Sequence, residues 1–368
     1  MGPRTRWVIG LGCLAGFGLL VWSPSPAQAG AGDEAAPSGR ARPQATAGLL
    51  SPVERLAPEI ALGPEDLAFG PDGALYAGIE GGRLLRNPAS GGPATTLAHT
   101  GGRPLGLAFD RQGRLLVADA QRGLLAVGAG GRVTVLADGE GGLPFRFTNG
   151  VAVGPSGAVY FTDSSSQRGP DGLYPEMLEG RPHGRLLRYD PATGAVARLL
   201  DGLYFANGVA VGPDESYLLV AETFAYRVTR YWLEGPRAGQ TDTFVDNLPG
   251  FPDGISYNGD GVFWLALFAP RSALLDAFND WPLVRGLLAR LPAWLLPTPG
   301  RYAHVLGLDT DGRVVHDLRD PAGTYAPISS ARQHREWLYL GSLTERGIGR
   351  VALPGAAINA RTLATARE

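Results

Sequence analysis

Four short stretches of the chain place an oxygen-bearing side chain at the same position before an apolar run. They are GPED around Glu65, FTNG around Asn149, FANG around Asn207 and FPDG around Asp253. A position that recurs in a sequence repeat recurs in space, so repeats arranged around an axis would bring these side chains together. Two carboxylates and two carboxamides make an all-oxygen site, which suits Ca²⁺ better than a transition metal. We therefore predict one Ca²⁺ ion held by these four residues.

A simpler interpretation of the same residues is turn chemistry. Asn149, Asn207 and Asp253 each precede a glycine, and Asn-Gly and Asp-Gly dipeptides are common in turns. Turns alone do not explain why four such residues share one phase of the repeat. Leu105 and Ile328 occupy the equivalent positions of the two remaining repeats, so only four side chains would hold the ion.

An ion held by four side chains keeps coordination positions open for a substrate oxygen. A metal ion can polarise that oxygen and stabilise the negative charge that develops on it. Asp253 is the candidate base or nucleophile, because a carboxylate in this position lies within reach of a bound substrate or water. It could equally serve as a ligand only, and the Ca²⁺ could be purely structural.

Five other titratable residues are expected near the same face of the molecule. Asp119, Asp163 and Glu222 end predicted second strands, while His99 and His183 lie near loops on that side. The three acids could shape a substrate pocket, or they could cap turns and neighbouring strands. Either histidine could shuttle protons, or it could be an ordinary histidine of a surface loop.

The elements that must position these residues are β-strands. One repeat contains the four strand-like runs GVAVGP, AVYFTD, GRLLRYDP and AVARLLD, separated by turn residues. The base period of roughly 40–45 residues is the length of a four-stranded propeller blade. We predict an all-β chain with a six-bladed β-propeller over residues 50–355. Val53 to Ala57 resembles an outer strand, so we expect it to complete the last blade and close the ring.

One segment breaks the β pattern. Ala273 to Leu296 is rich in leucine and tryptophan at helical spacing, and it interrupts the fifth blade between its second and third strands. We predict a short helical insertion there. It could be a lid over the central site, an apolar surface for peripheral membrane contact through 273–296, or a helix that simply packs on the propeller.

The N-terminus has the pattern of a secretory signal peptide over residues 1–29. Arg4 and Arg6 precede an apolar run from Trp7 to Trp22, and Ala27-Gln28-Ala29 follows as a cleavage pattern. The expectation is a secreted or periplasmic protein, with an uncleaved N-terminal membrane anchor as the alternative. Residues 30–49 are predicted to be a flexible linker, and 356–368 a C-terminal tail.

Composition excludes several other classes of function. The one cysteine, Cys13, lies in the N-terminal segment, so the mature domain would have no thiol for a disulfide, a zinc site or a nucleophile. The net charge of −2 gives no reason to expect a nucleic acid partner. No GxSxG, HExxH or phosphate-loop motif is present, so serine-hydrolase, zinc-protease and nucleotide-binding functions lack support.

The chain resembles the strictosidine synthase-like branch of six-bladed propellers, which includes adipocyte plasma membrane-associated protein. The resemblance rests on FANGVAVGPDESYLLVAETFAYRVTRYWLEGPRAG, TDTFVDNLPGFPDGIS, FTDSSSQ, GRLLRYDP and GRPLGLAF, and it covers about residues 50 to 354. More distantly, the chain is similar to paraoxonases, gluconolactonase/senescence marker proteins and diisopropyl fluorophosphatase. The calcium ligands of those proteins fall on Glu65, Asn149, Asn207 and Asp253. The resemblance implies a calcium-dependent lactonase or arylesterase-like hydrolase of a small ester or lactone.

The chain departs from these relatives at two places. Gly254 stands where several of them have an asparagine after the last aspartate. No acid is present near Ser329, where strictosidine synthase has its catalytic glutamate. A condensing enzyme of the strictosidine synthase type is therefore a weaker alternative than a hydrolase. A third alternative is a non-catalytic binding propeller with structural calcium.

Overall fold

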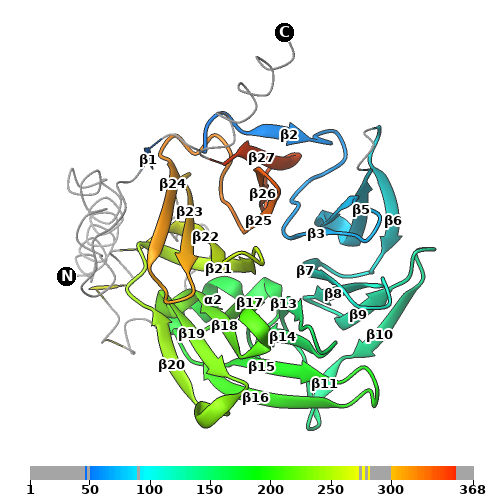
Figure 1. Ribbon diagram of the computed structural model, residues 1–368, viewed down its shortest axis with the longest axis vertical. Helices are drawn as coiled ribbons and strands as arrows, with labels where there is room; N and C mark the ends of the chain where they lie inside the picture. Colours follow the sequence, from blue (N-terminus) through cyan, green and yellow to red (C-terminus); the bar gives the residue numbers. More distant parts are fainter. Residues whose placement is uncertain are drawn as a thin grey trace, which may run out of the picture.

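The computed structural model describes residues 46–47, 50–88, 92–272, 276–277, 281 and 300–353. Within these residues, six sheets are arranged around a central axis, and the first strand of each sheet lies toward the middle (Figure 1). The chain is a mainly-β six-bladed propeller, which confirms the predicted fold class.

The first three blades each contain four antiparallel strands. The first blade contains β3 (Leu67–Phe69), β4 (Leu75–Gly78), β5 (Arg83–Asn87) and β6 (Thr95–His99). The second contains β7 (Pro104–Phe109), β8 (Leu115–Asp119), β9 (Gly123–Val127) and β10 (Val133–Ala137). The third contains β13 (Thr148–Val153), β14 (Val159–Asp163), β15 (Gly184–Tyr189) and β16 (Val196–Leu203). A small hairpin of β11 (Gly139–Glu140) and β12 (Leu143–Pro144) precedes the third blade.

The last three blades follow the same plan. The fourth contains β17 (Ala206–Val211), β18 (Tyr217–Glu222), β19 (Arg227–Trp232) and β20 (Thr241–Val245). The fifth contains β21 (Gly250–Tyr257), β22 (Val262–Pro270), β23 (Ala303–Asp309) and β24 (Val314–Asp320). The sixth contains β25 (Ser330–His334), β26 (Trp337–Gly341), β27 (Ile348–Ala352) and the N-terminal β2 (Glu54–Leu56).

Neighbouring blades pack face to face over apolar side chains. Because adjacent residues of a strand point to opposite faces of a sheet, the second strand of each blade supplies both of its interfaces. Phe263 packs into the core shared with the fourth blade, while the next residue, Trp264, packs into the core shared with the sixth. Both side chains are buried, and burial of such side chains stabilises the fold by about 1.5–3 kcal/mol each.

The ring closes by pairing the two ends of the chain, as predicted from Val53 to Ala57. β2 pairs antiparallel with β27, with Arg55 opposite Gly349, and the two strands lie side by side in Figure 1. Thr46 and Ala47, within the predicted linker, form β1, which pairs parallel with β24. The predicted signal peptide and the 356–368 tail lie outside the described residues.

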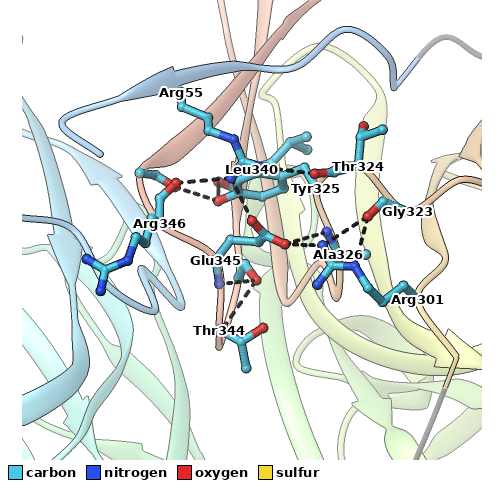
Figure 2. A network of polar contacts seen from close by, with 12 residues as sticks. Arg55, Arg301, Gly323, Thr324, Tyr325, Ala326, Leu340, Thr344, Glu345 and Arg346 are labelled. Atoms are coloured by element: carbon cyan, nitrogen blue, oxygen red, sulfur yellow. Dashed lines mark hydrogen bonds and ion pairs between the residues drawn. The ribbon is translucent and has the colours of Figure 1, made fainter. Parts of the chain in front are cut away.

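A buried carboxylate fastens the closing strand to its neighbours (Figure 2). Glu345 accepts hydrogen bonds from Arg55 Nη1 at 2.6 Å and from Arg301, which follows the insertion of the fifth blade. Arg55 also donates through Nη2 to Thr324 O at 2.7 Å, and its guanidinium lies over the ring of Tyr325. Burial alone would raise the pKa of Glu345, but the hydrogen bonds from the two arginines lower it below its ordinary value.

A short α-helix lies in the third blade. α2 (Leu173–Glu179) follows a 3-10 turn, η4 (Pro170–Gly172), in the connection between β14 and β15. It ends at Gly180, which adopts the left-handed conformation that commonly terminates helices. Further 3-10 turns are η3 (Glu80–Gly82), η5 (Pro213–Glu215), η6 (Thr223–Ala225) and η7 (Gly235–Arg237).

The predicted helical insertion of the fifth blade falls mostly outside the described residues. Its position between β22 and β23 agrees with the prediction, and Asp276 and Ala277 are helical. Trp281 is exposed. In the described part of the chain, no helix has the length and apolar character needed to cross a membrane.

Candidate metal centre on the propeller axis

Three of the four predicted ligands lie in irregular positions of inner strands, not in turns. Asn149, Asn207 and Asp253 fall where the pairing of β13, β17 and β21 with the second strand shifts register. Such β-bulges redirect a side chain relative to its neighbours along the strand. Glu65 occupies the equivalent place just before β3, where its N–H donates to Gly78 O. The turn interpretation of the Asn-Gly and Asp-Gly dipeptides is therefore wrong for this chain.

The glycines that follow Asn149, Asn207 and Asp253 permit the close approach of neighbouring blades. A Cβ on Gly150 would lie 2.6 Å from Asn207 O, and one on Gly208 would lie 2.7 Å from Asp253 O. A Cβ on Gly254 would lie 2.7 Å from Ser329 O. These distances are too short for any side chain, so the inner strands pack backbone against backbone around the axis. In this chain, an asparagine at position 254 would disturb this packing.

A narrow cavity of about 30 Å³ runs along the axis, large enough for an ion or a water and too small for an organic substrate. Glu65, Asn149 and Asn207 line it, together with glycine and serine residues of the other inner strands. Asp253 is 4% exposed and is not one of the lining residues. Its carboxylate instead receives a hydrogen bond from the side chain of Asn207. The structure thus brings the four predicted residues to one place on the axis.

Two hydroxyl groups set the orientation of the carboxamides. Ser164 Oγ donates to Ala206 O at 2.7 Å and accepts from Asn149 Nδ2 at 3.0 Å. Thr223 Oγ1 donates to Pro252 O at 2.8 Å and accepts from Asn207 Nδ2 at 3.2 Å. Because each hydroxyl has one proton and gives it to a carbonyl, it can only accept from the carboxamide. The carboxamide oxygens are thereby left available for a cation.

The charged forms of the two acids of the centre, Glu65 and Asp253, are unfavourable. Burial raises the pKa of Glu65 well above its ordinary value, and the carboxylates of Asp253 and Asp66 raise it further, against a smaller opposing effect of Arg103. Burial also raises the pKa of Asp253 to about 8, although the hydrogen bond from Asn207 opposes the shift. A divalent cation would remove this penalty by neutralising both charges. Two buried acids and two oriented carboxamides therefore fit a hard cation such as Ca²⁺.

We expect this electrostatic strain to make the metal-free protein less stable as pH rises. The folded pKa of Asp253 exceeds its ordinary value of 3.8, so between about pH 4 and pH 8 the native state holds a proton that the unfolded state lacks. Stability should fall across this window by up to about 1.4 kcal/mol per pH unit for one group. Thermal unfolding in chelator should show this decline for the wild type and a smaller one for Asp253→Asn. If stability declines with equal slope in the two proteins, the raised pKa does not belong to Asp253.

Two arginines flank the centre. Arg103 donates through Nη2 to Gly63 O at 3.0 Å, and its charge acts on Glu65 and Asp119. Arg332 lines the cavity and lies 3.7 Å from Asp66. Within the described residues, no group of three or more His, Cys, Asp or Glu side chains could hold a metal, so the candidate centre depends on its carboxamides.

The second-strand acids fasten backbone and do not line the cavity. Asp163 accepts from the N–H groups of Arg146 and Phe147, and Glu222 accepts from Tyr204 N. Asp119 accepts from Arg103 N in the same way. Each acid holds the chain that enters an inner strand, and Asp163 and Glu222 also pair with an arginine of the third strand. These contacts agree with the alternative that the three acids cap turns and neighbouring strands.

The two candidate histidines lie apart from the axial cavity. His99 is exposed at the end of outer strand β6. His183 Nδ1 lies 2.9 Å from Glu176 Oε1, a buried carboxylate of α2. His183 also lines a second cavity with Gln167, Arg168, Glu179 and Arg181. Sequence analysis missed Ser164 and Thr223, although both directly follow an acid at the end of a second strand.

Fold and centre together define a six-bladed propeller with a candidate ion site, lined by oxygen-bearing side chains, on its axis. A model of the strictosidine synthase family matches residues 149–236, and a model of the strictosidine synthase-like N-terminal region matches residues 48–87. Strictosidine synthase-like protein 7 of Arabidopsis thaliana is 35% identical over 297 residues, which cover 79% of each chain. Adipocyte plasma membrane-associated protein of Salmo salar is 36% identical over 319 residues, covering 80% of this chain and 76% of its own. The chain belongs to the strictosidine synthase-like family.

Solved structures share the fold at lower identity. A gluconolactonase from Xanthomonas campestris matches with a TM-score of 0.61 and 20% identity, covering 87% of this chain and all of its own. Regucalcin from Agrobacterium tumefaciens, named as a calcium-binding protein, matches with a TM-score of 0.59 and 19% identity. That match covers 81% of this chain and 93% of regucalcin. The chain thus shares its fold with gluconolactonase and regucalcin propellers.

Proposed function

We propose that this protein is a Ca²⁺-dependent hydrolase of lactones or esters. The observation that carries the proposal is that Glu65, Asn149 and Asn207 line an ion-sized cavity on the axis, with Asp253 hydrogen-bonded to Asn207 and both acids disfavoured as carboxylates by burial. The likeness to a gluconolactonase and to a calcium-binding propeller supports it. These four residues would hold the ion.

The residues of the chain have distinct parts in this reaction. When bound, Ca²⁺ would polarise the carbonyl oxygen of the substrate and stabilise the charge that develops on it. Asn149 and Asn207 present oxygens whose orientation is set by Ser164 and Thr223. Asp253 is the proposed base that takes a proton from the attacking water, because a carboxylate that holds the ion lies within reach of a bound water. The water oxygen bonds to the acyl carbon, the acyl–oxygen bond to the leaving group breaks, and the leaving oxygen takes the proton that Asp253 removed from the water.

The test is hydrolysis of a panel of lactones and phenyl acetate by the full chain, with Ca²⁺ and with chelator. Wild type should turn over at least one substrate only with Ca²⁺, and Asp253→Ala should lose at least about 100-fold in kcat/KM. Equal turnover in all four conditions would exclude the mechanism. Intact Ca²⁺ binding without turnover would identify a binding propeller with structural calcium.

A condensing reaction is not proposed. Strictosidine synthase-type condensation needs an acid near Ser329, but Ser329 and Ser330 occupy this place, and both hydroxyls donate to Glu65 O at 2.7 Å. These serines position the backbone of a candidate ligand, so they serve the metal centre.

A further inference from the structure

A second cavity lies where the two ends of the α2 connection in the third blade meet. It has a volume of about 380 Å³ and is lined by the polar residues Gln167, Arg168, Glu179, Arg181 and His183. The first two of these residues precede α2, Glu179 is its last residue, and the other two follow it. We call this space the neck cavity. Its volume lies in the range of small-molecule sites, whereas the axial cavity has room only for an ion or a water.

A buried carboxylate of α2 holds two of the lining side chains in place. Glu176 Oε1 lies 2.9 Å from His183 Nδ1, and Glu176 Oε2 lies 3.3 Å from Arg168 Nε. Arg168 also donates through Nη2 to Glu179 Oε1 at 2.5 Å. These contacts fix three of the five lining side chains before any ligand binds, which lowers the entropic cost of binding.

Three groups of the neck cavity keep binding capacity that the described part of the chain does not use. A carboxylate can only accept a hydrogen bond, so Nδ1 of His183 carries the proton and Nε2 of the neutral ring is left as an acceptor. Glu179 contacts Arg168 through Oε1, which leaves Oε2 as a second acceptor. Arg181 is exposed and forms no ion pair within the described residues, so its guanidinium is available as a charged donor.

The fixed charges around the neck cavity balance one another. Arg168 and Arg181 are positive, Glu176 and Glu179 are negative, and His183 is neutral when only Nδ1 is protonated. A ligand with a net charge of either sign would leave one charge without a partner. A zwitterion would instead pair each of its two charges and keep the site neutral.

We propose that the neck cavity binds a small zwitterion of the free α-amino acid class. The carboxylate of the ligand pairs with Arg181, and its ammonium donates to Glu179 Oε2 and His183 Nε2. This site goes beyond the proposed function, because none of its residues lines the axial cavity and its contacts need no Ca²⁺.

The test is a ligand-detected NMR titration of the full chain, in chelator, with L-alanine, propionate and ethylamine. Propionate lacks the ammonium of alanine and ethylamine lacks its carboxylate, so the three probes separate the two charged contacts. We expect alanine to bind at least about tenfold more tightly than either of the other probes, because only alanine makes both contacts.

Two variants should weaken different probes. Arg181→Gln should weaken alanine by at least about tenfold, weaken propionate as well, and leave ethylamine unchanged. Glu179→Gln should weaken alanine and ethylamine but not propionate. Neither side chain is buried, so both variants should fold. Arg188→Gln is the charge-matched control, because Arg188 is an exposed residue of β15 that does not line the cavity; it should leave all three affinities unchanged.

The inference is overturned if alanine shows no binding at about 10 mM, or if it binds no more tightly than propionate and ethylamine. It is also overturned if Arg181→Gln and Glu179→Gln weaken the same probes, or if Arg188→Gln acts like Arg181→Gln. The titration contains no Ca²⁺, so a failure of the proposed hydrolase would leave this site standing, and a failure of this site would leave the hydrolase standing.

Discussion

Neutralising Asp253 should abolish the stabilisation that we expect Ca²⁺ to give to the wild-type protein. An ion that binds only the native state stabilises it by about 2.7 kcal/mol at a concentration 100 times its dissociation constant. Asp253→Asn and Glu65→Gln each remove one of the two charges that balance the ion, and each should weaken binding by at least about 100-fold. Thermal unfolding with Ca²⁺ and with chelator measures the difference. The large shift of the wild type should shrink to nearly nothing in both variants.

The control for this experiment is a buried acid outside the centre. Glu222 is fully buried and ion-paired with Arg227 at 2.7 Å, so Glu222→Gln should destabilise the fold through a local loss. It should nevertheless keep the full Ca²⁺-dependent shift. If Asp253→Asn keeps that shift as well, Asp253 is not a ligand and the axial centre is assigned incorrectly.

Adding a single methyl group at Gly208 should disrupt both the fold and the centre. A Cβ there would lie 2.5 Å from Ile255 N and 2.7 Å from Asp253 O, so the inner strands of the fourth and fifth blades must separate. We expect Gly208→Ala to lower the free energy of unfolding by about 2–4 kcal/mol. Because the displaced backbone carries Asp253, Ca²⁺ affinity should fall too. Denaturant titration and calorimetry measure the two effects.

The control is a glycine with free space around it. Its replacement by alanine measures the general effect of such a substitution on stability, without a clash between blades. Gly130 has no atom within 4 Å of an added Cβ, and Gly130→Ala should change stability by less than about 0.5 kcal/mol. If Gly208→Ala is equally neutral, the blades do not meet backbone to backbone at the axis.

The propeller could be predicted from sequence because its signals are local and repeated. Each blade shows the same four runs, and alternation within a run such as Phe263-Trp264 assigns adjacent residues to opposite faces. Closure by β2 was predictable from two observations. An outer-strand pattern precedes the first blade, and the last blade lacks an outer-strand pattern of its own. The convergence of Glu65 and Asp253 followed from repeat phase alone, without any knowledge of packing.

The local geometry of the centre could not be predicted, because it depends on contacts between blades. An Asn-Gly dipeptide can form a turn or lie in a β-bulge, and the dipeptide alone does not show which. Only the approach of Asn207 O to Gly150 distinguishes the bulge from a turn here. The hydroxyls of Ser164 and Thr223 matter because each donates to the next blade. α2 has only seven residues, too few for a clear periodic pattern.

Closure by the two ends of the chain determines the order in which the protein can be completed during synthesis. Arg55 and its partner Glu345 are separated by 290 residues, so the first blade-forming strand to leave the ribosome waits for the last. Until then β2 lacks its partner strand β27, and such unpaired strands favour association with other chains. Chaperone dependence during translation, more than after it, is the expected biological cost of this architecture.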